Sequence, residues 1–488
     1  MKIRIECGYA FVRAYGFILF ALALVVGCFV AQAMIGAAPS DSSLFRYIGW
    51  RMSCGAQCFE DIWDHKGPLI FLLNAIGYVT GIGAGSVYFL VWIVAVIGVF
   101  LLGRRYSLLI GSLSAAVFAV AGLGFAAGVF LDNVELTAAI FMVAAALLFL
   151  REPNWWTHMA VGVCIGGAFL TKPNLISGGV AMVVFCGLQA LRDHNLKTFV
   201  MFGFWSGLGF MIALVGMTIV FAAHGTGWAM WDAMLFFNAF EYASHGTDTW
   251  AMWWLGYLRH SVFSMSPGWW MIPSYLTMLV VGLLGASVVR GRGGFLMVWA
   301  LLETFAAFMA KQFYGHYLLM PLVPLSVLVA ISCVQTGRIM RTLSRLLVIG
   351  GAGLFLVAIW TGIHSAIARR SLIESSARAV AEVIPPGKEV ACFVREGGAE
   401  MMLRDKIWSR QKYQFGVNFW RYMKPKRQLQ VADDLLKALC STNIEHFIFE
   451  GGPSAIDYFS NCPELVTELK NWHKVADTDF VDVYIRHQ

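Results

Sequence analysis

The chain has 488 residues, of which 59% are hydrophobic and 13% are charged, whereas about 25% of the residues of soluble domains are charged. Together with a mean hydropathy of +0.68, this composition excludes a single soluble core. The net charge of +7 is no sign of nucleic-acid binding, because the basic residues of the membrane part lie in short loops between apolar runs, as membrane topology explains. We expect a lipid bilayer as partner and no nucleic acid.

Apolar runs of about 20 residues, long enough to cross about 30 Å of hydrocarbon, recur from the N-terminus to Ile367. From Arg369 the chain is charged and has ordinary apolar patterning. We therefore predict a membrane domain over residues 1–368 and a soluble domain over 369–488. This second domain alternates short β-like runs with a helical pattern, which predicts a small α/β fold. The runs are Glu389–Val394, Glu445–Phe449 and Phe480–Ile485, and the helical pattern spans Ala432–Leu439.

The basic residues predict the orientation. Lys2, Arg4 and Arg13 precede the first apolar run, which is too long for a signal peptide, so a retained first span with a cytoplasmic N-terminus is predicted. Pro68–Ile82 is apolar but short, and we interpret it as a re-entrant or interfacial helix. Including the first span, about eleven crossings are predicted. Because this number is odd and the N-terminus is predicted to be cytoplasmic, the C-terminal domain is expected outside the cytoplasm of a multi-pass plasma-membrane protein. The predicted crossings are 11–35, 86–102, 107–127, 134–150, 155–171, 174–191, 198–222, 269–289, 294–310, 313–335 and 346–367.

The first outer loop, about 36–66, carries charge beside hydrocarbon. Its residues Glu60 to Asp64 suit either a solvated loop with interfacial tryptophans or a functional site. Asp41 and Lys66 each adjoin the start of an apolar segment, where an unpaired charge is costly, so a functional or paired role is favoured. Cys54 and Cys58 in this loop could form a disulfide or remain two thiols.

A second acidic motif, Asp132-Asn-Val-Glu135, follows the third crossing. At the start of a helix, carboxylates three residues apart share a face and could hold a divalent cation or a shared proton. Alternatively, they only favour the helix N-terminus through its dipole.

Cationic side chains recur at the outer edges of later spans. Lys172 lies in a tight turn, and Lys311 begins the segment Lys-Gln-Phe-Tyr-Gly-His316-Tyr317. Both lysines could meet a lipid phosphate or simply snorkel to the interface, while the His316 imidazole could serve a phosphate or carry a proton. Glu303, inside a span, is expected to be paired within the bundle. The aromatic outer loop at 223–268, with Asn238 and Tyr242, could stack on sugars or form an interfacial belt.

The order of these motifs resembles the GT-C class of membrane glycosyltransferases, in particular its protein O-mannosyltransferase and aminoarabinose transferase branch. The elements that carry the resemblance are Asp41, the segment Trp63-Asp-His-Lys-Gly-Pro-Leu69, the pair Asp132 and Glu135, and Phe313-Tyr-Gly-His-Tyr317. The segment from Trp63 has Gly67 where the family has proline, and Ser42 stands where many relatives have a second acid.

The resemblance implies that a sugar is transferred, with inversion, from a polyprenyl-phosphate carrier to a glycan, lipid or protein acceptor on the outer face. It implies that Asp41 is the general base and that Asp132 or Glu135 orients the acceptor. It also implies a phosphate site formed by basic and polar side chains. A divalent cation, Mg²⁺ or Mn²⁺, is a further candidate ligand, with Asp41, Asp132 and Glu135 as the residues that would hold it. The residues of the phosphate site would be His65, Lys66, Lys172, Lys311, His316 and Tyr317.

A transporter or flippase of lipid-linked glycans is the alternative, because it too would have many spans. Transporters place ionisable groups near the bilayer midplane, whereas nearly all acids of this membrane domain lie at the outer edges of loops. A scaffold that presents the C-terminal domain would need neither Asp41 nor Lys66.

Overall fold

The computed structural model describes most of the chain. The residues outside the description are 1, 36–40, 127–132, 243–270, 290–293, 310–314, 410, 416–419, 421–422, 442, 451–453, 479–480 and 487–488. The chain forms two compact units. The first comprises Met1–Met34, Tyr88–Met217 and Asp248–His364, and the second comprises Ile35–Val87, Thr218–Thr247 and Ser365–Gln488.

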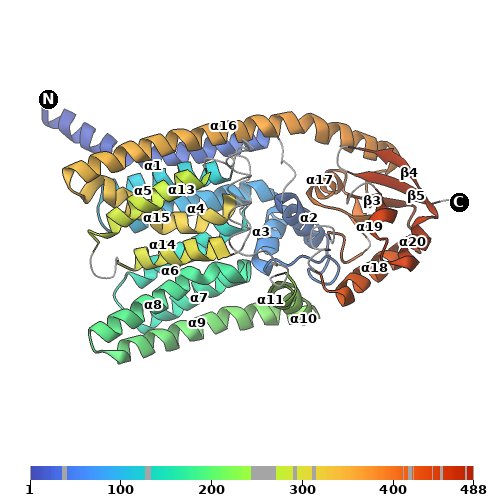
Figure 1. Cartoon of the computed structure of the whole chain (residues 1–488), viewed down its shortest axis with the longest axis horizontal. Helices are drawn as coiled ribbons and strands as arrows, with labels where there is room; N and C mark the ends of the chain where they lie inside the picture. The colour runs from blue at the N-terminus through green and yellow to red at the C-terminus, as the bar shows by residue number, and fades with distance from the viewer. Residues whose placement is uncertain are drawn as a thin grey trace. The chain divides into compact units, whose positions relative to one another are not determined.

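The first unit is a bundle of helices built around α15 (Leu319–Gln335), nearly all of whose side chains are buried. The neighbours of α15 include α5, α6, α13 and α14 (Figure 1). The helices that lie wholly or mainly in this unit are α1 (Lys2–Ile35), α4 (Ala84–Arg104), α5 (Leu108–Phe125), α6 (Val134–Phe149), α7 (Trp155–Thr171), α8 (Ser177–Arg192), α9 (Leu196–Ala223), α13 (Met271–Ala286), α14 (Phe295–Met309), α15 and the N-terminal half of α16 (Arg338–Val383).

This bundle confirms the predicted all-α membrane domain, since each predicted crossing coincides with a helix. Within the described ranges, seven helices are long and apolar enough to cross a membrane. The helices α6, α7, α13 and α14 are shorter, with 16, 17, 16 and 15 residues, so eleven crossings stay a prediction. Helix α3 (Pro68–Val79) has 12 residues, about 18 Å, which is too short to cross the hydrocarbon.

The second unit joins the C-terminal domain to two segments that the sequence predicts to lie outside the cytoplasm. One contains α2 (Asp41–Ser53) and α3, and the other contains α10 (Gly227–Trp231), a π-helix (Asp232–Phe237) and α11 (Asn238–Phe240). The predicted first outer loop thus includes a helix of 13 residues that the sequence analysis missed. Leu44, Tyr47 and Ile48 lie on its buried face, and α2 packs on α3 and α17 (Glu396–Arg404).

The C-terminal domain has a mixed five-stranded sheet of order β2-β1-β3-β5-β4, which confirms the predicted α/β fold. Strands β1 and β2, and β1 and β3, are parallel, whereas β5 is antiparallel to β3 and β4. The strands are β1 (Glu389–Phe393), β2 (Trp408–Ser409), β3 (His446–Phe449), β4 (Trp472–Asp477) and β5 (Asp482–Arg486). The helices besides α17 are α18 (Pro425–Leu439), α19 (Ala455–Tyr458) and α20 (Pro463–Leu469).

Side chains of α2 cover the edge of this sheet. The Tyr47 hydroxyl accepts a hydrogen bond from the Ser409 amide at 3.1 Å and donates one to the Ile407 carbonyl at 3.1 Å. Arg51 Nη1 donates to the Ser409 carbonyl at 3.0 Å. Because an open edge strand leaves backbone groups unpaired, these bonds make α2 part of the same folded unit as the sheet. The compact-unit boundary at Ser365 lies near the predicted domain boundary at 368, but this unit also includes Ile35–Val87 and Thr218–Thr247.

Candidate functional site

Asp41 begins α2, and its side chain is exposed. Among the residues that the structure describes, the Asp41 carboxylate has no hydrogen bond or ion pair. Asp41 is therefore a solvent-accessible acidic side chain in the first turn of α2.

The segment Asp64-His65-Lys66 forms a tight turn at the start of α3. The Lys66 amide donates to Asp64 Oδ1 at 2.9 Å, as in an Asx-turn. Asp64 is 2% exposed, and burial raises its pKa. The Lys66 charge and the backbone hydrogen bonds oppose this rise, and the Asp41 charge adds to it. The electrostatic coupling places Asp41 and this turn in one neighbourhood.

His65 connects Lys66 to the segment that follows α10. Lys66 Nζ lies 2.6 Å from His65 Nε2, and His65 Nδ1 lies 2.7 Å from Asn238 Oδ1. The His65 ring also packs against Tyr242, with 5.1 Å between ring centroids. Asn238 was noted in the sequence only as part of an aromatic loop. No local signal could have paired it with His65, because 173 residues separate the two.

A second polar cluster lies in the first compact unit. Lys172 directly follows α7, and its Nζ forms a 2.8 Å ion pair with Glu135, which is 2% exposed. The same Nζ lies 4.2 Å from the centre of the Tyr317 ring, and His316 is close enough to act electrostatically on Glu135. The structure thus joins Glu135, Lys172, His316 and Tyr317. The Lys172 charge is already balanced by Glu135.

Glu303 lies beside this cluster. The Glu303 carboxylate accepts hydrogen bonds from Ser177 Oγ at 2.8 Å, from the Gly178 amide at 3.0 Å and from Trp299 Nε1 at 3.1 Å. Because the first amides of a helix lack intrahelical partners, Glu303 caps the N-terminus of α8. Glu303 therefore stabilises the junction of α8 and α14.

Several predicted features fall outside this geometry. Asp132 and Lys311 lie outside the described residues. No group of three or more His, Cys, Asp or Glu side chains that could hold a metal occurs in the described part of the chain, and the predicted site of Asp41, Asp132 and Glu135 stays a prediction. Cys54 and Cys58 are free thiols, one exposed and one buried.

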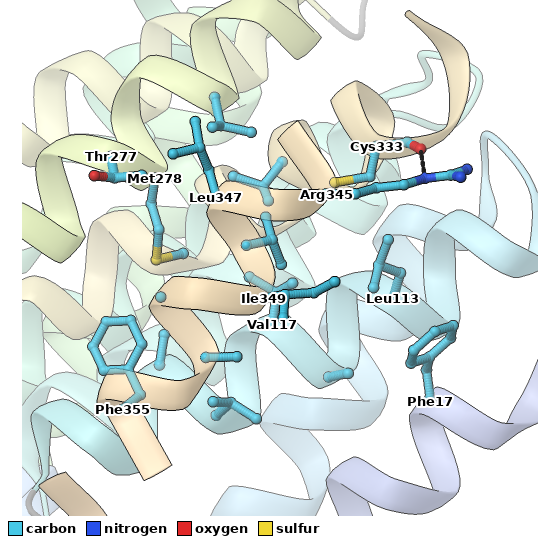
Figure 2. A pocket seen from close by; sticks show the side chains of 18 of the residues that line it. Phe17, Leu113, Val117, Thr277, Met278, Cys333, Arg345, Leu347, Ile349 and Phe355 are labelled. Carbon is cyan, nitrogen blue, oxygen red and sulfur yellow. Dashed lines mark hydrogen bonds between the residues drawn. The ribbon is translucent and has the colours of Figure 1, made fainter. Parts of the chain in front are cut away.

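Figure 2 shows a cavity of about 800 Å³ in the first unit. Apolar side chains such as Phe17, Val117 and Phe355 line it, and Arg345 at its margin donates from Nε to the Cys333 carbonyl at 2.9 Å. None of the predicted site residues that the structure describes lines this cavity.

No family model matches the chain, and no curated protein matches its sequence. The solved structures that match its fold include two that cover nearly the whole length of both chains. The first is ArnT from Cupriavidus metallidurans bound to undecaprenyl phosphate, with a TM-score of 0.54, 14% identity, and coverage of 96% of this chain and 98% of that one. The chain has the GT-C fold.

The second match is the same ArnT in the apo state, with a TM-score of 0.52, 14% identity and coverage of 98% of both chains. The GT-C fold was expected from the order of the sequence motifs, and it accounts for the helical bundle and the C-terminal domain together. The chain is a multi-pass membrane protein.

Proposed function

We propose that this protein is an inverting glycosyltransferase that takes a sugar from a polyprenyl-phosphate carrier and transfers it to a glycan, lipid or protein acceptor on the outer face. The observation that carries the proposal is the exposed Asp41 carboxylate in the same compact unit as the Lys66 ammonium. The GT-C fold supports it, as does ArnT, a structure of this fold, which was solved with undecaprenyl phosphate bound.

Asp41 is the proposed general base. The acceptor hydroxyl oxygen attacks the anomeric carbon from the face opposite the phosphate, and Asp41 takes the hydroxyl proton. A new C–O bond forms as the bond from the anomeric carbon to the phosphate oxygen breaks, so the configuration inverts. The electron pair leaves with the polyprenyl phosphate.

Lys66 is the proposed phosphate ligand. Negative charge grows on the phosphate as it leaves, and a preorganised cation beside it stabilises the transition state more than the ground state. Lys172 suits this task less, because Glu135 already balances its charge. We assign the Glu135–Lys172 pair to the hydroxyl groups of the acceptor, since it offers one acceptor and one donor, with His316 and Tyr317 beside it.

Replacing Asp41 with Asn tests the proposal. The amide keeps the size of the side chain but cannot take a proton, so transfer should fall by about 10²-fold or more, with expression and thermal stability unchanged. Asp61, an exposed acid of the same loop, provides the matched control as Asp61→Asn. If the Asp41→Asn variant kept full turnover in purified form, the assignment of the base would be wrong.

A further inference from the structure

The orientation of the Asn238 amide determines the protonation of His65. Asn238 Nδ2 donates to two backbone carbonyls, of His65 at 2.8 Å and of Met234 at 2.7 Å. Carbonyl oxygens only accept, so the NH₂ group must face them and Oδ1 must face His65 Nδ1. Since Oδ1 also only accepts, His65 Nδ1 carries the hydrogen.

The other nitrogen of His65 then faces Lys66. A neutral imidazole protonated at Nδ1 has a lone pair at Nε2, and Lys66 Nζ lies 2.6 Å from it. An imidazolium would instead direct an N–H toward the ammonium. His65, which is 5% exposed, therefore holds Lys66 without neutralising its charge, unlike Glu135 at Lys172.

Asn238 is held in turn by α18 of the C-terminal domain. Arg427 forms two hydrogen bonds with the Asp232 carboxylate, at 2.9 and 3.0 Å, and one with Glu241 at 2.8 Å. In the sequence, Asp232 and Glu241 lie on either side of Asn238, which directly follows the π-helix Asp232–Phe237. The Arg427 side chain is 11% exposed, and its guanidinium lies 5.5 Å from the centre of the Phe237 ring.

We propose that Arg427, through Asn238 and His65, positions the Lys66 ammonium, so that the C-terminal domain prepares the site for the lipid phosphate. The phosphate part of this inference rests on the proposed function, whereas the positioning of Lys66 does not. His65 is then a positioning residue and not a phosphate ligand. Arg427 acts at a distance, through the segment that it binds on both sides of Asn238.

Two measurements test this chain of contacts on the full-length protein. The first is the rate at which a limiting amine-acylating reagent modifies Lys66, followed by mass spectrometry with Lys388, which is half exposed, as internal reference. The second is the affinity for undecaprenyl phosphate in detergent. The variants are Arg427→Met, Asn238→Leu and His65→Phe. Arg486→Gln, which breaks an ion pair with Glu468 elsewhere in the domain, is the matched control.

Each of the three variants should change the Lys66 modification rate several-fold and weaken undecaprenyl phosphate binding by about tenfold, the effect of losing one hydrogen bond to a charged group. His65→Gln should restore much of both, because its side-chain oxygen can accept from Lys66. Arg486→Gln should change neither. Asn238→Leu and His65→Phe leave the Arg427 ion pairs intact, so they test the relay even if Arg427→Met fails to fold.

Failure of the positioning role and failure of the proposed phosphate role give different results. An unchanged Lys66 modification rate in Asn238→Leu and His65→Phe would overturn the positioning role. If that rate changes while Lys66→Ala binds undecaprenyl phosphate as the wild type does, the positioning stands and the phosphate role of Lys66 is wrong.

Discussion

At the residue scale, Asp64 couples the site to pH. Burial raises the pKa of its carboxyl group in the folded protein, so the unfolded chain loses its proton at lower pH than the folded chain. Folded stability therefore falls as pH rises from the unfolded pKa through the raised folded pKa. The stability that a protonated Asp64 supplies is present only at acid pH.

Asp64→Asn keeps a carbonyl oxygen for the Lys66 amide and removes the titration. We expect its Tm, relative to the wild type, to increase as the pH is raised from 4 to 8. Asp64→Ala should instead lower the stability by about 1 kcal/mol, because it removes the acceptor of the partly buried Lys66 amide. Thermal unfolding of the purified variants across this pH range measures both effects, and a wild type that gains stability relative to Asp64→Asn with rising pH would contradict the expected sign.

At the element scale, glycines allow α7 and α9 to approach closely. A Cβ at Gly162 would overlap the Ser206 carbonyl, and one at Gly209 would overlap the Met159 carbonyl. Small residues commonly mediate such contacts between membrane helices. A Cβ at Gly203, also on α9, would have nothing within 4 Å.

Gly162→Ala should therefore lower the Tm in detergent, because backbone atoms cannot move aside cheaply. Gly203→Ala should leave it unchanged or raise it slightly, since alanine favours helix. Equal Tm values for the two variants would show that this helix contact is looser than described.

The elements also show how far the sequence could be interpreted. Apolar runs predicted the helices of the bundle, and alternating runs predicted β1, β3 and β5. Helix α2 was missed because Asp41, Arg46 and Arg51 make the segment polar, although Leu44, Tyr47 and Ile48 recur at helical spacing. Lys66 and His65 are adjacent in the sequence, and their side chains meet in the structure. Asn238 and Arg427 join them only through tertiary contacts between distant parts of the chain, which no local pattern indicates.

At the scale of the whole molecule, the second compact unit constrains the topology. Because α2 and the C-terminal sheet fold together, both must lie on the same side of the membrane, which the positive-inside rule predicts to be the outside. Two exposed native thiols report the side on which each part lies: Cys54 directly follows α2, and Cys440 directly follows α18 of the C-terminal domain. His194, an exposed residue between α8 and α9, lies on the predicted cytoplasmic side.

A membrane-impermeant maleimide added to intact cells should label Cys54 and Cys440 but not a His194→Cys variant, which should react only after the membrane is opened. Mass spectrometry of the labelled peptides reads out all three positions. Labelling of one native thiol without the other in intact cells would contradict the shared side.

Sugar transfer from a lipid-linked donor is the central claim for the molecule, and release of the carrier tests it most directly. Purified protein in detergent is incubated with a panel of polyprenyl-phosphate sugars and candidate acceptors, and polyprenyl phosphate is quantified by mass spectrometry. We expect release with at least one donor, dependent on acceptor and on Asp41, and a product of inverted anomeric configuration. The account would be contradicted if the protein bound lipid-linked sugars but released no polyprenyl phosphate. Movement of those lipids across the membrane of reconstituted vesicles would then favour a flippase.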